Sequence, residues 1–319
     1  MEQMLNMLPP EMQVLMKQMS LKDFPQNPTS KSYKGHNFIP MFSPEVAEYA
    51  YDKMSVKEGD VYIVSYPKTG TNWTYEIIRQ MLYRDPMSEE LSKRIPLQLG
   101  VIEMEPCEKF ALLDKLPLQR RIMGSHLPAE LVNVDRITKA NAKIVYVYRN
   151  PKDQIVSWLK FASKLPVVNE EPMKSMLNSG WDKYFEHVVA GDFPMNMKPG
   201  QWYPDHILGW YKHRDNKNVH FACFEEMKQD LPREIKKLAD FLDVSLSNDE
   251  VDKITEACTF ANMKKNIATD GSNRSKILDI NMRKGEVGGW KNYFTVAQSE
   301  RVDTLFKEKL AETDIRFTY

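Results

Sequence analysis

The segment from Val61 to Trp73 constrains the fold more than any other part of the sequence; it reads VYIVSYPKTGTNW. Its first residues are mostly β-branched and predict a buried strand that ends before Pro67. From Trp73 onward, apolar residues recur at helical spacing, so a helix is expected to follow. The turn between them carries Lys68. Such a turn directs backbone N–H groups and the positive end of the helix dipole at one point, which suits a phosphate.

The order of residues in this turn differs from that of a Walker A loop. There the lysine follows the second glycine, whereas here Lys68 precedes Gly70 and no lysine directly follows it. The same segment is also compatible with an ordinary strand–turn–helix that exposes a lysine. Residues elsewhere in the chain have to discriminate between these interpretations.

Composition limits the class of protein. The chain has 319 residues, 42% of them hydrophobic, which is enough for a sizeable core. Its 44 basic and 44 acidic side chains balance, which argues against nucleic-acid or membrane-surface binding. Cys107, Cys223 and Cys258 show no paired or metal-binding spacing, and no apolar run has the length of a membrane span. We therefore expect a cytoplasmic protein without a metal site.

Strands and helices are predicted to alternate along the chain. Further strands are expected at residues 121–126, 143–149 and 219–224. Helices are expected after Pro44 and Pro151 and over residues 173–190, 201–213, 225–243, 247–265 and 296–310, whereas residues 86–120 are expected to be irregular. This alternation predicts an α/β fold, with helices flanking a central, mostly parallel sheet.

The predicted organisation is a single main domain, residues 46–319, preceded by an N-terminal segment, residues 1–45. That segment is expected to be helical over residues 1–20, then extended, and to pack on the body. In parallel sheets, ligands bind at the carboxyl ends of the strands. Lys68, His126 and Arg149 all follow predicted strands, so we expect them to share one site.

The sequence resembles that of the cytosolic sulfotransferases at five places. Tyr66–Trp73 resembles their 5′-phosphosulfate loop, Arg149–Ser157 their 3′-phosphate strand and helix, and His126–Pro128 the segment with their base. Arg283–Gly285, followed by GGWK at 288–291, resembles their C-terminal nucleotide loop, and Lys291–Glu300 their dimer-contact motif. The resemblance implies a P-loop-like phosphosulfate loop, a possible homodimer and transfer of a sulfuryl group from 3′-phosphoadenosine 5′-phosphosulfate.

The resemblance also implies the roles of individual residues. His126 would be the general base, and Lys68 would stabilise the leaving phosphate oxygen. The product would be adenosine 3′,5′-bisphosphate, formed without a metal. The implied cofactor-binding residues are Lys68, Thr69, Gly70, Thr71, Asn72, Trp73, Arg149, Ser157, Phe224, Cys258, Phe260, Arg283, Lys284 and Gly285.

The acceptor is expected to be a hydrophobic small molecule, such as a steroid, another alcohol or a phenol. The predicted pocket residues are Val101, Met104, His126, Trp158 and Phe161, with residues 266–280 as a mobile lid. Gly124 departs from the family's pattern, because many members carry a lysine there, and this favours an alcohol over a simple phenol. Phe224 and Cys258 stand where the family frequently has tyrosine and threonine, so we expect one nucleotide contact to be lost and another to be weaker.

Two other functions stay open on the sequence alone. A P-loop kinase or nucleotide hydrolase would need Mg²⁺ and a lysine after the second glycine, and no lysine directly follows Gly70 here. A sulfotransferase-like protein that binds the nucleotide with weak or no catalysis is compatible with Gly124, although Lys68 and His126 together argue against it. Without the resemblance, His126 would be read as an ordinary core histidine.

Overall fold

The computed structural model describes residues 32–39, 41–95, 100–164, 171–270, 279–280, 282 and 285–318. The helix expected over residues 1–20 and the Arg283–Lys284 pair lie outside these residues. The strands are β1 (Ser32–Tyr33), β2 (His36–Asn37), β3 (Val61–Ser65), β4 (Ile122–Ser125), β5 (Lys143–Tyr148) and β6 (Val219–Cys223). The first part of the chain contributes helices α3 (Pro44–Asp52), α4 (Thr71–Leu82), α5 (Pro86–Arg94), α7 (Lys109–Lys115), α8 (Val134–Lys139) and α9 (Pro151–Ala162).

The second part of the chain is mainly helical. Its α-helices are α10 (Met173–Asn178), α11 (Trp181–Ala190), α12 (Tyr203–Tyr211), α13 (Phe224–Gln229), α14 (Leu231–Phe241), α15 (Asn248–Ala257), α16 (Phe260–Asp270) and α18 (Val296–Lys309). Two short 3₁₀ helices complete the described chain, η1 (Ala129–Leu131) and η3 (Gly289–Asn292).

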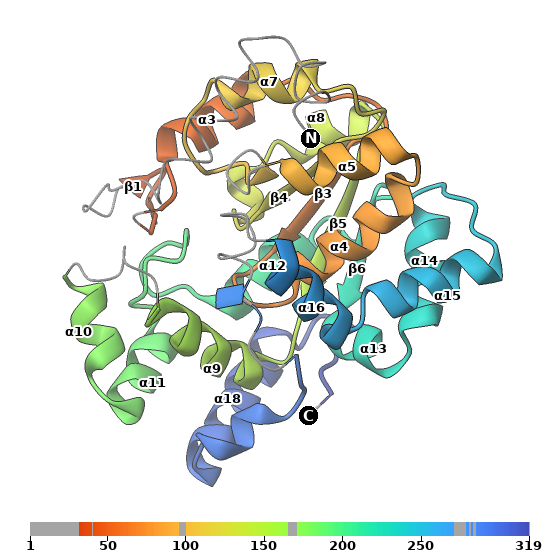
Figure 1. The fold of residues 1–319 in the computed structure, drawn as a ribbon. Coiled ribbons are helices and arrows are strands. Elements are labelled where there is room, and N and C mark those ends of the chain that lie inside the picture. Colours follow the sequence, from red (N-terminus) through yellow and green to blue (C-terminus); the bar gives the residue numbers. More distant parts are fainter. Residues whose placement is uncertain are drawn as a thin grey trace.

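A parallel four-stranded sheet organises the molecule, with the strand order β4-β3-β5-β6 (Figure 1). Every neighbouring pair in this sheet is parallel, so all four carboxyl ends lie along one edge. The four strands are those that the sequence predicts, and helices flank the sheet on both faces. The predicted α/β fold is therefore confirmed.

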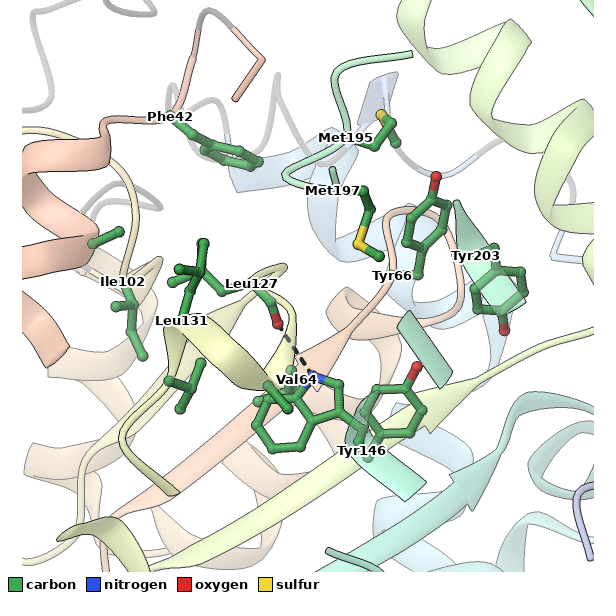
Figure 2. Close-up of a cluster of buried hydrophobic side chains, with 14 of the residues drawn as sticks. Phe42, Val64, Tyr66, Ile102, Leu127, Leu131, Tyr146, Met195, Met197 and Tyr203 are labelled. Atoms are coloured by element: carbon green, nitrogen blue, oxygen red, sulfur yellow. Dashed lines mark hydrogen bonds between the residues drawn. The ribbon is translucent and has the colours of Figure 1, made fainter. Parts of the chain in front are cut away.

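Alternation along the strands separates two hydrophobic cores. On β3, Val61 and Ile63 face one core, which α4, α14 and α15 cover, whereas Tyr62 and Val64 face the other. The larger core lies against α3, α9, α11, α12 and α18. Figure 2 shows part of it, around Val64, Tyr66 and Tyr146, including the hydrogen bond of 3.1 Å that Trp210 Nε1 donates to the carbonyl oxygen of Leu127. Burial on both faces explains why the strands read as continuous apolar runs.

Local signals set the ends of the helices. Ser43 caps α3 by accepting a hydrogen bond from the N–H of Val46, and Asn150 caps α9 through the N–H of Lys152. The expectation that residues 86–120 are irregular is wrong, because this segment contains α5 and α7. In α5 the carboxylate of Asp85 accepts from the N–H of Ser88, and Pro86 occupies the first helical position, where its missing N–H costs nothing.

Three predicted helical regions are each divided into two helices. Gly180, with φ 87°, separates α10 from α11, and Asp230 ends α13 and caps α14. The region 247–265 divides between α15 and α16 at Cys258 and Thr259. Residues 266–270 of the predicted lid are the last turn of α16, whereas 271–278 lie outside the described residues.

Two further expectations concern membrane-spanning helices and dimerisation. In the described part of the chain, no helix has both the length and the apolar character that a membrane crossing requires. The predicted dimer segment, Lys291–Glu300, comprises the end of η3 and the start of α18, where the side chain of Val296 is 75% exposed. Dimerisation through this segment stays a prediction.

Candidate active site

A cavity opens at the carboxyl ends of the strands and collects most of the predicted site residues. Its walls include Lys68, Gly70, Thr71, Asn72, Trp73, Val101, Met104, His126, Arg149, Ser157, Trp158, Phe161, Phe224, Phe260 and Gly285. These residues come from segments between positions 68 and 285, and only the parallel sheet brings them together. Gly124 also lines the cavity.

The loop between β3 and α4 has a backbone that constrains its residue types. Lys68 has φ 73° and Gly70 has φ 126°. A Cβ atom at Gly70 would lie 2.9 Å from Cδ2 of Phe224 and 3.3 Å from a methyl group of Val147, so the position requires glycine for space as well as for its dihedral angle. The loop therefore lies directly against the end of the sheet.

Lys68 extends from this loop toward α9. Its ammonium group lies 4.1 Å from the ring centroid of Phe161, which is a cation–π distance. The first residues of α4 begin immediately after Gly70, so the positive end of that helix dipole points at the same part of the cavity. A cation and a helix N-terminus thus lie at one end of β3, an arrangement that favours an anionic group.

His126 follows β4 and reaches the cavity with a defined ring orientation. Its Nδ1 lies 2.9 Å from the carbonyl oxygen of Ser65 and 3.3 Å from the hydroxyl oxygen of the same residue. A carbonyl oxygen can only accept, so Nδ1 carries the proton and donates it to Ser65. In the neutral ring, Nε2 is then the nitrogen with a lone pair. The ring of Phe42 packs against the imidazole, with 5.9 Å between centroids.

Glu103 fixes the backbone beneath His126. Its fully buried carboxylate accepts hydrogen bonds from the N–H of His126, at 2.6 Å, and from the hydroxyl of Ser125, at 3.0 Å. The ammonium of Lys109, also fully buried, donates to the carbonyl oxygens of Val101 and Met104 on either side of Glu103. Burial lowers the pKa of Lys109 to about 7, against the opposing attraction of Glu103.

The opposite end of the cavity is built around Arg149, which follows β5. Its guanidinium lies 4.2 Å from the ring centroid of Phe224, and its Nη2 donates a hydrogen bond of 2.9 Å to the carbonyl oxygen of Glu286. The carboxylate of Glu225 lies 4.0 Å from its Nε, and burial raises the pKa of that carboxyl. The side chain of Arg149 is 11% exposed, so its orientation is set by these neighbours.

Aromatic rings form the wall beyond Arg149. Trp73 meets Phe224 edge to face, with 5.2 Å between centroids, and its indole N–H donates to the carbonyl oxygen of Cys258 at 2.8 Å. Phe260 packs so closely against Gly285 that an added Cβ there would approach Cδ2 of the ring to 2.4 Å. Flat apolar faces next to a guanidinium suit a nucleobase attached to a phosphate.

Two predicted cofactor residues do not line the cavity. The hydroxyl of Thr69 is buried and donates to the carbonyl oxygens of Tyr66, at 2.8 Å, and Val147, at 3.0 Å. Cys258 is fully buried and contacts the site through its carbonyl oxygen on Trp73. Arg283 and Lys284 lie outside the described residues, so their predicted role is unaffected.

Sequence reasoning missed several residues of the cavity wall. These are Ile39, Met41, Phe42, Lys228, Met263, Met282 and Glu286. The first three belong to the extended segment before α3, and no local pattern indicates that this segment folds over the ends of β3 and β4. The apolar residues of α16 carry a helical periodicity, which predicts the helix but not what the helix faces.

Metal binding receives no support from the described residues. Within residues 32–318, apart from the gaps named above, no group of three or more His, Cys, Asp or Glu side chains is arranged to hold a metal ion. The prediction of a metal-free reaction stays a prediction.

Comparisons with known proteins agree with this site. A family model described as a sulfotransferase domain matches residues 58–314. An amine sulfotransferase from Oryctolagus cuniculus is 32% identical over 301 residues, which cover 90% of this chain and 93% of that protein. Cytosolic sulfotransferase 1 from Danio rerio is 30% identical over 312 residues, 94% of this chain and 99% of that protein.

A solved structure extends the likeness to three dimensions. Mouse sulfotransferase SULT7A1, crystallised in a complex with PAP, is 31% identical and superposes with a TM-score of 0.71, covering 89% of this chain and 96% of that one. The family model, the relatives and this structure agree along nearly the whole chain. The chain therefore belongs to the cytosolic sulfotransferase family, enzymes that transfer a sulfuryl group to a hydroxyl or an amine.

Proposed function

We propose that this sulfotransferase moves the sulfuryl group of 3′-phosphoadenosine 5′-phosphosulfate to a hydroxyl or amine of a hydrophobic small molecule, with His126 as general base. The observation that carries this proposal is the hydrogen bond from Nδ1 of His126 to the carbonyl oxygen of Ser65. It leaves Nε2 as the proton acceptor in the cavity that also contains Lys68.

The chemistry of the cavity wall fits the donor. Lys68 and the N-terminus of α4 suit its 5′-phosphosulfate, and Arg149 suits its 3′-phosphate, because a guanidinium binds phosphate through two hydrogen bonds. The rings of Trp73 and Phe224 suit the adenine. The PAP complex of the mouse relative supports the same nucleotide for this chain.

Each residue would serve a defined step of an in-line displacement. When bound, the donor supplies the sulfuryl group and a phosphate as leaving group. His126 takes the acceptor's proton on Nε2 as a new S–O or S–N bond forms. Lys68 and the N–H groups at the start of α4 stabilise the negative charge that develops on the phosphate oxygen as its bond to sulfur breaks.

The proposed acceptor is apolar around its reacting group. The apolar side chains that line the cavity with His126 include Met104, Trp158, Phe161, Ile39, Met41 and Phe42. Gly124 also lines the cavity, and a Cβ added there would fit in ordinary van der Waals contact, 3.8–4.0 Å from Gly100, Thr71 and Val101. Such walls suit a steroid, another alcohol or a hydrophobic amine better than a charged metabolite.

A thermal-shift series followed by a turnover assay tests the proposal. Adenosine 3′,5′-bisphosphate should raise the melting temperature without Mg²⁺, because a ligand that binds only the folded state stabilises it. Sulfation of an acceptor panel with the intact donor then separates catalysis from nucleotide binding alone. Stabilisation by ATP that depends on Mg²⁺, without any response to the bisphosphate, would favour a kinase instead.

A further inference from the structure

The carboxylate of Asp153 joins helix α9 to the loop that follows Gly285. Asp153 is the third residue of α9 and is 4% exposed. Its Oδ2 accepts a hydrogen bond from the N–H of Gly288 at 2.7 Å, and its Oδ1 accepts one from the N–H of Trp290 at 3.0 Å. One buried side chain thus satisfies two backbone donors on a segment more than 130 positions away.

The loop that Asp153 holds continues to the part of the cavity around Arg149, the proposed 3′-phosphate site. Gly285 and Glu286 line the cavity, and the carbonyl oxygen of Glu286 accepts the hydrogen bond from Nη2 of Arg149. Asp153 therefore contacts the loop a few residues beyond the carbonyl that orients the guanidinium. The same loop also packs on the ring of Phe260 through Gly285.

We propose that Asp153 is a positioning residue for the donor's 3′-phosphate: it holds the 286–290 loop on α9 so that Glu286 orients Arg149. This inference rests on the proposed function and extends it, because Asp153 itself does not line the cavity. Its carboxylate acts through the loop, and we expect the largest effect on the phosphate that Arg149 is proposed to bind.

A carboxylate is required at this position for a chemical reason. Its two oxygens accept from two N–H groups, and the N-terminus of α9 favours its negative charge. In Asp153→Asn the side chain keeps one acceptor, while its NH₂ group must face the N–H of Gly288 or Trp290. One of the two hydrogen bonds is lost and the loop is released on that side.

The test compares two nucleotides that differ in the 3′-phosphate. Calorimetric titration of the full-length Asp153→Asn variant should show about tenfold weaker binding of adenosine 3′,5′-bisphosphate than wild type, as expected when one charge-assisted hydrogen bond is lost. Binding of adenosine 5′-monophosphate should change by less than about twofold. Equal losses for both nucleotides, or no loss for either, would overturn the inference.

Asp303→Asn is the matched control. Asp303 lies on α18, and its Oδ2 accepts from the ammonium of Lys152, the residue before Asp153, at 2.7 Å. The substitution makes the same chemical change in a carboxylate that also anchors α9. It should lower the melting temperature without changing the ratio of the two affinities. A changed ratio would show that any loosening of α9 has this effect and would refute a specific role of Asp153.

A measurement on the wild-type protein covers the case in which Asp153→Asn does not fold. At saturating concentrations, the bisphosphate should slow hydrogen exchange at the N–H groups of Gly288 and Trp290 more than the monophosphate does. Equal protection would refute the coupling. If the wild-type protein binds neither nucleotide, the proposed function is refuted. If the wild-type protein binds both and the Asp153→Asn variant has the same affinities, only the inference about Asp153 is refuted.

Discussion

Nδ1 of His126 lies 2.9 Å from the carbonyl oxygen of Ser65, so the ends of the neighbouring strands β3 and β4 are joined through the imidazole. The hydroxyl of Ser65 in turn lies 2.5 Å from that of Thr71, the first residue of α4. The proposed base and the proposed phosphate loop therefore share one hydrogen-bonded connection.

Replacing His126 should separate chemistry from binding. In His126→Ala we expect turnover to fall roughly 10²–10⁴-fold, because the acceptor loses the group that takes its proton. The affinity for adenosine 3′,5′-bisphosphate should stay near that of wild type. His187→Ala, which removes an imidazole on α11 that is hydrogen-bonded to Asp192, serves as the control and should sulfate acceptors normally. Normal turnover in His126→Ala would exclude it as the base.

Replacing Lys68 and replacing Arg149 should impair different steps, catalysis and nucleotide binding. Lys68→Ala is expected to lower kcat roughly 10²-fold, the usual effect of losing one group that stabilises a developing oxyanion. Arg149→Ala should instead weaken nucleotide binding most, because the proposed role of its guanidinium is to bind the 3′-phosphate, which does not react. Steady-state kinetics together with calorimetric binding would distinguish them. An unchanged kcat in the first variant would remove Lys68 from the mechanism.

Gly70 should tolerate no side chain. Gly70→Ala places a Cβ 2.9 Å from the ring of Phe224 at φ 126°, so we expect a loss of roughly 2–4 kcal/mol in the free energy of unfolding. Gly200→Ala is the control, because Gly200 has φ 77° but nothing within 4 Å of an added Cβ. It should cost only the strain of the dihedral angle, about 1 kcal/mol. Equal losses by denaturant titration would show that the contact with Phe224 is unimportant.

The burial of Lys109 should appear in the pH dependence of stability. In the unfolded chain its pKa is ordinary, 10.5, whereas burial lowers the pKa in the folded protein to about 7. Between these values the unfolded chain binds more protons, so the contribution of Lys109 to the free energy of unfolding rises with pH. The rise is at most about 1.4 kcal/mol per pH unit.

Lys109→Met tests this dependence by removing the ionisable group. The difference in stability between wild type and variant should move in favour of wild type from pH 7 to pH 9. Lys93→Met, which removes a lysine whose side chain is 49% exposed, provides the comparison and should show no such trend. Parallel pH profiles for wild type and Lys109→Met would mean that the folded protein does not lower the pKa of this lysine.

Much of the fold could be predicted because its signals are local. The four strands are buried on both faces and read as apolar runs, and Asn150 with Pro151 marks the start of α9. The order β4-β3-β5-β6 was not predicted, because strand order depends on contacts between distant segments. The sequence does not indicate α5 and α7 for another reason: residues 86–120 contain several prolines, which favour irregular structure, although Pro86 here begins a helix.

The candidate site likewise contains some residues that local sequence signals indicate and others that they do not. Lys68, His126 and Arg149 were found because each follows a strand, where a parallel sheet exposes its ligand-binding edge. The sequence assigns no role to Glu103 and Asp153, because each carboxylate accepts a hydrogen bond from the backbone of a segment that is remote in sequence. Phe42 was missed because the extended segment before α3 carries no periodicity that indicates the cavity.

The strand order has a consequence for how such an enzyme can change its specificity. The segment with the proposed base follows β4, one of the two edge strands, whereas the proposed phosphate and adenine contacts follow β3, β5 and β6. We therefore expect substitutions around β4 to alter that part of the acceptor pocket while leaving the proposed donor contacts in place. Exchanging residues 100–131 between related sulfotransferases should therefore give hybrid enzymes that sulfate a different acceptor with the same sulfuryl donor.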